Sequence, residues 1–212
     1  MFTALCFVVS LCCVSSVLCG DAPFQKAVED AVKSSDVIHV DVVKANLPNF
    51  SYQANDMNYM GLKDCAISNM KVEKDKSKFQ FDLVCPKIII TGHYEAKGSL
   101  LDQMVNGNGK MKITVDGYLY TVICNYEEKN DENNKPYIHI KDFEVKKESK
   151  GSIVFGLANL ADGDAEKSEA LFKYFNANWK KMEEVVRNPA LDAVFAVFVE
   201  NLNKNLKAMP VD

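Results

Sequence analysis

Three histidines, His39, His93 and His139, are the side chains of this sequence best suited to acid–base or metal chemistry. All three fall where the local pattern predicts β-strands, and surface or hydrogen-bonded histidines are the simpler interpretation. His93 and Glu95 lie two residues apart on a face that we expect to be exposed, and no third ligand accompanies them. The sequence also has no G-x-S-x-G, H-E-x-x-H or C-x-x-C motif. We therefore expect no catalytic site, no metal site and no cofactor.

Two acidic residues flank a glycine in the segment Asp162-Gly163-Asp164. Carboxylates this close together can bind a cation. The segment directly precedes a helical pattern, however, and an aspartate at such a position commonly caps the helix by accepting hydrogen bonds from its first N–H groups. A turn followed by a helix N-cap therefore explains this segment better than a cation site does.

The first 20 residues carry no charged side chain and combine a short apolar core with small residues, which is typical of a secretory signal peptide. A membrane anchor is the alternative, but serines interrupt the apolar run and the run is short for a membrane span. Cleavage is expected after Cys19 or Gly20, and cleavage after Ser16 also fits the pattern. Residues 21–212 are then expected to form one soluble extracellular domain, with no stretch apolar enough for stable membrane insertion.

Four of the seven cysteines lie in the predicted signal peptide, so Cys65, Cys85 and Cys124 remain beyond it. Cleavage after Ser16 would retain Cys19 as a fourth cysteine. The register of a predicted hairpin, described below, puts Cys65 directly opposite Cys85, and we predict a disulfide between them. The alternative is that Cys124 pairs with one of the two.

Net charge and a glycosylation sequon indicate what surface this protein presents. The sequence has 25 Lys and Arg against 29 Asp and Glu, a formal net charge of −4. This acidity argues against nucleic acid or anionic lipid surfaces as the main partner. The sequon Asn49-Phe50-Ser51 predicts N-glycosylation at Asn49, which then has to lie at the surface.

Two unusually long strand patterns dominate the middle of the chain. Residues 86–101 alternate so that one face is polar and the other consists of Ile88, Ile90, Gly92, Tyr94, Ala96, Gly98 and Leu100. After an expected loop at 102–110, residues 110–124 alternate in the same way. Tyr118 and Tyr120 then lie on the polar face, and the apolar face consists of Met111, Ile113, Val115, Gly117, Leu119, Thr121 and Ile123. Long strands with inward glycines favour a highly curved antiparallel sheet.

A hairpin precedes these strands, and its apolar residues determine its register. Val72 can lie opposite Phe79 while Ile67 lies opposite Leu83 only if one extra residue is inserted between the two pairs. We therefore predict a β-bulge at residues 68–69. The same register brings the two cysteines of the predicted disulfide together.

Helical patterns flank the strands. Residues 23–34 predict an amphipathic helix whose apolar stripe contains Phe24, Ala27, Val28 and Ala31. From Asp164 onward, apolar residues recur at spacings of three and four, first over 164–187 and again beyond Pro189. Asn188 can cap a helix that restarts at Pro189, which gives either two helices or one long kinked helix.

The remaining segments are expected to be shorter elements. The pattern predicts a strand at 36–44, a loop at 46–56 and a charged hairpin tip at 125–136. One or two further strands are expected over 137–158, with a shift of face near residues 141–142.

A strongly curved sheet beside a long helix encloses a space, and the sequence leaves two interpretations of that space. In the first, the helix of residues 164–187 fills it completely and the glycines admit the bulk of the helix. In the second, helix and sheet leave an elongated apolar tunnel. Such a tunnel needs a ligand or a functional reason, because packed protein interiors tolerate few voids larger than a water molecule.

Several short motifs occur in a characteristic order along the chain. The central ones are Gly61-Leu62, Phe81-Asp82-Leu83, Pro86, Gly92-His93-Tyr94 and Gly98. Those of the carboxyl end are Asn159-Leu160, Gly163-Asp164, Asn176, Asn178-Trp179 and Pro210. Together they resemble the insect takeout and haemolymph juvenile hormone-binding proteins of the tubular lipid-binding superfamily. The amino end departs from that family, because its early cysteine pair is absent and its approach to the sheet is shortened.

This resemblance implies an α+β fold in which a highly curved antiparallel sheet wraps around a long C-terminal helix and encloses a hydrophobic tunnel. It also implies a secreted carrier, in haemolymph or another extracellular fluid, of an elongated hydrophobic ligand such as a juvenile hormone-like terpenoid or a fatty acid. We expect a monomer, with an unknown receptor as its one further partner. The alternative is a protein that interacts with lipid surfaces or pathogen lipids, which the net charge of −4 disfavours.

The residues expected to line the tunnel are apolar or aromatic and come from both long strands and the C-terminal helices. Tyr94 or Trp179 could orient a polar head group. The full set is Tyr94, Leu100, Ile113, Val115, Leu119, Phe172, Phe175, Trp179, Val194, Phe195 and Phe198.

Overall fold

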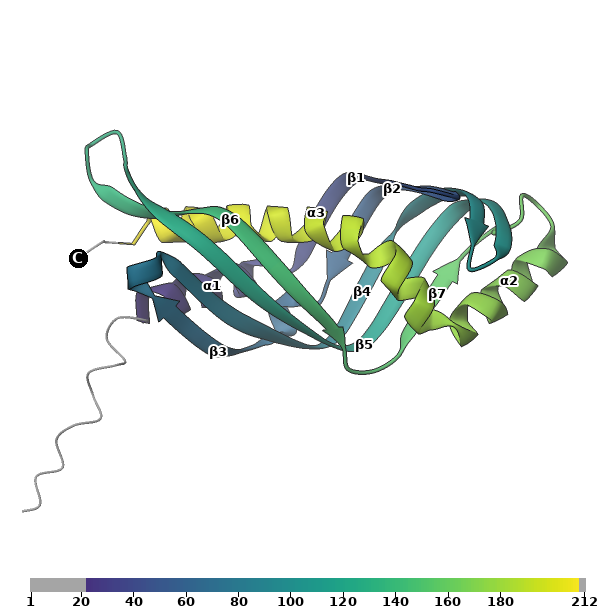
Figure 1. The fold of residues 1–212 in the computed structure, drawn as a ribbon, viewed down its shortest axis with the longest axis horizontal. Coiled ribbons are helices and arrows are strands. Elements are labelled where there is room, and N and C mark those ends of the chain that lie inside the picture. The colour runs from purple at the N-terminus through teal and green to yellow at the C-terminus, as the bar shows by residue number, and fades with distance from the viewer. Residues whose placement is uncertain (1–21, 210–212) are drawn as a thin grey trace, which may run out of the picture.

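The structure is a computed structural model that describes residues 22–209. One seven-stranded antiparallel sheet curves around a long helix (Figure 1). The strand order is β1-β2-β4-β5-β6, with β3 added beside β4 and β7 added beside β5. The strands are β1 (Val37–Leu47), β2 (Phe50–Met60), β3 (Ala66–Glu73), β4 (Lys78–Leu100), β5 (Gln103–Asn130), β6 (Pro136–Ser149) and β7 (Ile153–Leu157). The expected α+β class and the curved antiparallel sheet are therefore confirmed.

Three α-helices accompany the sheet: α1 (Ala22–Ser34), α2 (Ala165–Ala177) and α3 (Trp179–Lys207). The helix α3 runs along the inside of the curved sheet, α1 lies beside its C-terminal end, and α2 lies near β7 at the opposite end of the molecule (Figure 1). Two short 3-10 turns, η1 (Leu62–Asp64) and η2 (Lys74–Lys76), connect strands. The predicted N-terminal helix is confirmed, and its stripe from Phe24 to Ala31 is buried.

The predicted hairpin register is confirmed. Val72 pairs with Phe79 and Ile67 pairs with Leu83, and the register shifts between Ser68 and Lys71. The bulge therefore lies where the sequence placed it. A disulfide joins Cys65 to Cys85, and Cys124 is free and buried, so the alternative pairing is wrong.

The two longest strands exchange their inner and outer faces at the same point. In β4 the odd residues 79–85 point inward, but from Ile88 onward the even residues do. In β5, Met111 and Val115 point inward before Gly117, whereas Tyr118 and Tyr120 do so after it. Cys85 pairs with Tyr118 and Lys87 pairs with Asp116, so Pro86 and Gly117 lie opposite each other where the ladder is interrupted. Proline has no N–H to donate there, and Gly117 has a φ of 79°, which an L side chain disfavours.

This exchange corrects the alternation expected for residues 110–124. The expectation assumed that Gly117 continues the inward row, which would leave Leu119, Thr121 and Ile123 inside. Because Gly117 turns the chain over instead, these three residues are only partly buried, and Tyr118, Tyr120 and Val122 fill the interior. The expected shift of face near residues 141–142 is confirmed, because the pairing of β5 with β6 is irregular there.

Gly98, a glycine of the inner face, allows the backbone of a neighbouring hairpin to approach β4 closely. The space that a side chain at position 98 would take is occupied by the turn between β1 and β2, because a Cβ at Gly98 would overlap the backbone oxygen of Asn49. The N–H of Ser99 donates to that same oxygen at 2.7 Å. The absence of a side chain at position 98 therefore lets the β1–β2 hairpin close against β4, and it does not by itself leave room for a ligand.

Four expected boundaries are wrong. The charged tip expected at 125–136 is shorter, because β5 continues to Asn130 and β6 begins at Pro136. The loop expected at 46–56 is a two-residue turn at Pro48 and Asn49, and the loop expected at 102–110 is a two-residue turn at Leu101 and Asp102, so both hairpins are tighter than expected. The helical region is interrupted at Asn178 and continues through Pro189. The expected N-cap at Asp164 is confirmed, since its carboxylate accepts from the N–H of Lys167 at 2.9 Å.

Substitution of Gly98 by alanine should destabilise the fold strongly. The backbone there has a left-handed φ of 119°, and the new Cβ would clash with the backbone oxygen of Asn49. Gly98→Ala should lower the free energy of unfolding by about 3 kcal/mol or more. Gly163→Ala is the matched control, because Gly163 also has a positive φ of 91° but nothing within 4 Å of a Cβ. The control should lose only about 1 kcal/mol. Equal losses in urea denaturation would show that close approach at Gly98 is unimportant.

Candidate functional site

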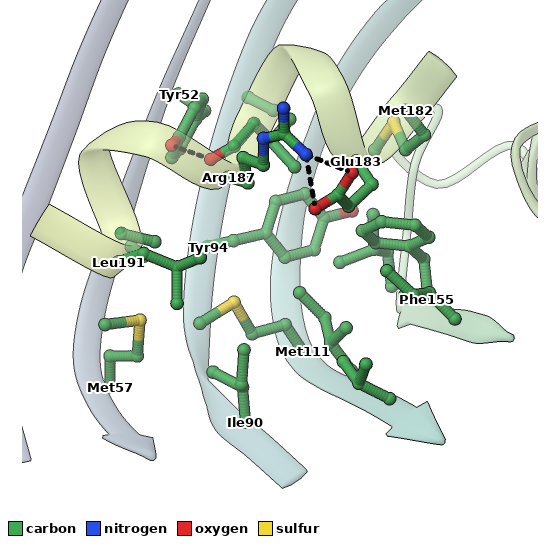
Figure 2. Close-up of a pocket in the computed structure, with 18 of the residues that line it drawn as sticks. Tyr52, Met57, Ile90, Tyr94, Met111, Phe155, Met182, Glu183, Arg187 and Leu191 are labelled. Carbon is green, nitrogen blue, oxygen red and sulfur yellow. Dashed lines mark hydrogen bonds and ion pairs between the residues drawn. The ribbon is translucent and has the colours of Figure 1, made fainter. Parts of the chain in front are cut away.

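A partly enclosed cavity lies between the N-terminal half of α3 and the inner face of the sheet (Figure 2). The centre of a water-sized sphere can reach a volume of about 120 Å³ inside this cavity. Its sheet wall consists of Phe50, Tyr52, Ala54, Met57 and Tyr59 from β2, Ile90, Tyr94, Ala96 and Leu100 from β4, and Val105, Met111, Ile113, Val115, Tyr118 and Tyr120 from β5. The other wall consists of Ile153, Phe155 and Leu157 from β7, Leu160, and Met182, Glu183, Val186, Arg187, Ala190 and Leu191 from α3.

The cavity occupies only one half of the space inside the sheet. The rest of that space, beyond Tyr118 and Tyr120 on the far side of Pro86 and Gly117, is filled mainly by aromatic side chains. Phe79 stacks with Phe81 at a ring distance of 6.2 Å, Phe81 contacts Phe198 at 6.4 Å, and Phe195 lies 5.9 Å from Phe198. The molecule therefore combines a solid end, around α1 and the C-terminal half of α3, with a hollow end around the N-terminal half of α3.

Four of the eleven expected lining residues lie on the cavity wall. They are Tyr94, Leu100, Ile113 and Val115. All four precede the exchange of faces in β5 or follow it in β4, where the expected alternation agrees with the structure. Their role in binding a ligand stays a prediction.

The other seven expected lining residues lie outside the cavity wall, for three different reasons. Leu119 lies on the outer face because of the exchange at Gly117. It pairs there with Val84, which is exposed. Val194, Phe195 and Phe198 belong to the solid end. The remaining three, Phe172, Phe175 and Trp179, lie on α2 or at the start of α3 and precede Met182, the first α3 residue on the cavity wall.

Five tyrosines line the cavity, and the hydroxyl of each has a hydrogen-bond partner. Tyr52 donates to the backbone oxygen of Val186 at 2.7 Å, and Tyr94 donates to that of Ala158 at 2.7 Å. The hydroxyls of Tyr59 and Tyr120 bond to each other, and Tyr118 donates to Glu183. Since their polar tips are occupied, these tyrosines present mainly ring carbon to the cavity.

Burial changes the acidity of these phenols. It raises the pKa of Tyr52 and of Tyr94 to about 12. Burial also raises the pKa of Tyr59 and Tyr120, and the pKa of Tyr118 is raised by burial and then by the neighbouring carboxylate of Glu183. The phenols therefore stay neutral in the folded protein well above neutral pH.

Glu183 and Arg187 are the two charged side chains on the cavity wall. They are one turn apart on α3, and Arg187 Nη1 lies 3.0 Å from Glu183 Oε2 and 3.2 Å from Oε1. Glu183 is buried, with 7% of its surface exposed. Burial lowers the pKa of Arg187, but the ion pair with Glu183 outweighs it, so the pKa lies above its ordinary value and the guanidinium stays charged. Figure 2 shows the pair on the α3 side of the cavity, near Tyr52 and Tyr94.

Neither charged residue belongs to the expected lining set, which consists of apolar and aromatic side chains. The spacing contained a signal, however. Glu183 follows Trp179 by four residues, and Arg187 follows Glu183 by four, so the pair continues the inward stripe beside Met182 and Val186. Tyr118 was missed for a different reason, the exchange of faces at Gly117.

The histidines stand apart from this cavity. His39 bonds to Asn58 and Asp41 on the surface, His93 is exposed together with Glu95, and His139 is half-buried on β6. Within residues 22–209, no three His, Cys, Asp or Glu side chains form a group that could hold a metal ion. No helix in the same range is both long and apolar enough to cross a membrane.

Comparisons with known proteins agree with this architecture. The family model described as "Haemolymph juvenile hormone binding protein (JHBP)" matches residues 29–212. The chain is similar to the crystal structure of Epiphyas postvittana Takeout 1, with 25% sequence identity, a TM-score of 0.81, and coverage of 90% of this chain and 91% of that one. A crystal structure of lipopolysaccharide binding protein gives 10% identity and a TM-score of 0.40 over 89% of this chain and 36% of that one, which is too weak to support an argument. No curated protein sequence matches the chain.

The buried phenols predict that the protein loses stability in alkali. A group whose pKa is raised by folding stabilises the folded state below its unfolded pKa, and this contribution is lost as pH rises toward the folded pKa. Unfolded tyrosines ionise at about pH 10, whereas Tyr52 and Tyr94 keep their protons to about pH 12. The free energy of unfolding should therefore fall as the pH rises from about 10. Full phenolate absorbance of all eight tyrosines near pH 10 with the circular dichroism unchanged would contradict this account.

Proposed function

We propose that this chain, which belongs to the haemolymph juvenile hormone binding protein family, is a secreted carrier that holds an elongated hydrophobic molecule in the cavity between α3 and the sheet. The observation that carries the proposal is the cavity itself. It is lined almost entirely by carbon, and the polar groups of its tyrosines are already hydrogen-bonded to protein atoms. A juvenile hormone-like terpenoid or a fatty acid has the shape and apolar character that such a wall accepts.

The size and the wall of the cavity support binding with some adjustment. An apolar cavity of about 150 Å³ holds a benzene-sized group, so a volume of about 120 Å³ accommodates a small apolar segment as it stands. A longer ligand requires side chains to move. Met57, Met111 and Met182 lie on the wall, and unbranched methionine side chains adapt readily to differently shaped partners.

Apolar burial alone is sufficient for useful affinity. Burying roughly 400 Å² of apolar ligand surface at about 25 cal/mol/Å² contributes roughly 10 kcal/mol before the association costs are subtracted. A micromolar dissociation constant corresponds to about 8.2 kcal/mol and a nanomolar one to about 12.3 kcal/mol, so apolar burial on this scale allows affinities no tighter than about micromolar without a charged contact.

Secretion, glycosylation and a monomeric state are parts of the same proposal. The Cys65–Cys85 disulfide supports passage through an oxidising compartment, because disulfides persist there and are rare in the cytosol. Asn49 is exposed in the turn between β1 and β2, where a glycan can be attached. The predicted signal peptide and its cleavage site lie outside the described residues. A receptor that recognises the loaded carrier is a further expectation.

The direct test is binding of a fluorescent apolar probe to the purified protein. Saturable binding that a terpenoid or a fatty acid displaces, together with an apolar molecule in organic extracts of the natively purified protein, is the expected result. Mass spectrometry identifies the extracted molecule. An empty extract combined with no probe binding would count decisively against a carrier.

Narrowing the cavity should weaken binding without unfolding the protein. Ala54 is buried on β2 and lines the cavity, so Ala54→Leu places a larger side chain in the ligand's space. The affinity for the probe should fall at least about tenfold, with thermal stability unchanged or raised because a void is filled. Phe198→Leu is the control, because Phe198 lies in the solid end. It should lower the free energy of unfolding by about 1–2 kcal/mol and leave the affinity unchanged. The opposite pattern would place the binding site at the solid end.

A further inference from the structure

The ion pair of Glu183 and Arg187 is out of place in a wall that otherwise presents carbon. The side chain of Glu183 is 9% exposed and that of Arg187 is 30% exposed, so the carboxylate bears most of the desolvation cost. The attraction within such a pair often does no more than compensate this cost. If this region of α3 only packed against the sheet, apolar side chains of similar size would serve at least as well. The pair therefore needs a reason beyond packing.

Within the pair, the carboxylate of Glu183 has its hydrogen-bond partners, whereas in the part of the chain that the structure describes the guanidinium of Arg187 lacks one. Glu183 accepts from Tyr118 and from Arg187 Nη1, so its carboxylate is well satisfied. On Arg187, the Nε atom is buried and has no hydrogen-bond partner within residues 22–209. A buried N–H without a partner is unfavourable, and in this case it belongs to a side chain that lines the cavity.

The surrounding structure holds this donor in place. Tyr118 fixes Glu183, Glu183 fixes one edge of the guanidinium, and Tyr52 bonds to the carbonyl of Val186, the residue directly before Arg187. A donor that is already oriented loses little freedom when a ligand atom reaches it. It can therefore contribute to affinity and specificity more than a mobile surface arginine does.

The charge balance indicates which kind of ligand atom fits. Glu183 neutralises the guanidinium, so the pair as a whole carries no net charge. A free carboxylate bound at Nε would bring a second negative charge close to Glu183 in a low-dielectric site, which is unfavourable. An uncharged acceptor, such as an ester, ketone or amide carbonyl, satisfies the N–H without that repulsion.

We propose that Arg187, held by Glu183 and Tyr118, forms a polar subsite in the cavity whose Nε–H binds an uncharged carbonyl acceptor at one end of the ligand and disfavours free carboxylates. This inference rests on the proposed carrier function and makes it more specific. Arg187 acts as a specificity-determining residue, while Glu183 and Tyr118 position it.

The test compares three probes of similar chain length: methyl tetradecanoate, free tetradecanoate and the hydrocarbon pentadecane. The ester should bind about tenfold or more tightly than either of the others, because one hydrogen bond to a charged donor is gained without repulsion. Isothermal titration or displacement of a fluorescent apolar probe measures the three dissociation constants at a pH where tetradecanoate is ionised.

Two variants identify the donor. Arg187→Lys keeps the positive charge beside Glu183 but removes Nε–H, and it should lose the preference for the ester while still binding pentadecane. The double substitution Glu183→Gln with Arg187→Met removes both charges, so that no buried carboxylate is left unpaired, and it should bind ester and hydrocarbon equally. If Arg187→Lys does not fold, as judged by circular dichroism, the double variant decides.

The possible outcomes separate this inference from the carrier function. Binding of none of the three probes by the unmodified protein would overturn the carrier function and the subsite with it. Equal binding of pentadecane and the ester, or an ester preference that survives in both variants, would leave the carrier standing and overturn the subsite. Tightest binding of tetradecanoate would overturn the choice of an uncharged ligand.

Discussion

The exchange of faces at Pro86 and Gly117 is the constraint on which the rest of the structure depends. Because the two residues lie opposite each other, the two longest strands turn over together and their pairing register continues unchanged on both sides. Before Pro86 the inward residues of β4 include Phe79 and Phe81, whereas the inward residues after it, such as Ile90, Ala96 and Leu100, are mostly smaller. A single continuous sheet therefore builds a solid end and a hollow end. The solid end stabilises the fold, which frees the hollow end from having to pack completely.

The helix α3 bridges the two ends and is attached differently in each. Its C-terminal half packs through Phe195 and Phe198 into the solid core. Its N-terminal half is held by hydroxyl groups, since Tyr52 bonds to the carbonyl of Val186 and Tyr118 bonds to Glu183. Pro189 lies between the halves and withholds one helical hydrogen bond. The N-terminal half of α3 is therefore joined to the sheet by polar contacts, in addition to the apolar contacts that dominate its C-terminal half.

The sequence predicted those features that depend on local patterns. The register of the β3–β4 hairpin and the disulfide followed from keeping apolar residues on one face, and the short motifs indicated the family. The turnover at Gly117 could not be predicted in this way, because a glycine fits either continued alternation or a reversal. The lining residues at Phe195 and Phe198 were misplaced for a related reason, since periodicity shows that a residue faces inward but not whether the space it meets is filled. Glu183 and Arg187 were missed because a charged pair on an inward stripe is usually assigned to the solvent-exposed side.

The hydrogen-bond inventory of the cavity bears on what can occupy it. A buried water molecule needs roughly two to four polar partners. The tyrosine hydroxyls already have partners, and among the described residues Arg187 Nε is the buried side-chain donor that lacks one. One donor cannot stabilise a cluster of water molecules in a wall of carbon. A molecule with a long apolar body and a single acceptor matches this inventory much better, because its body displaces poorly bonded water and its one polar atom meets the one available N–H.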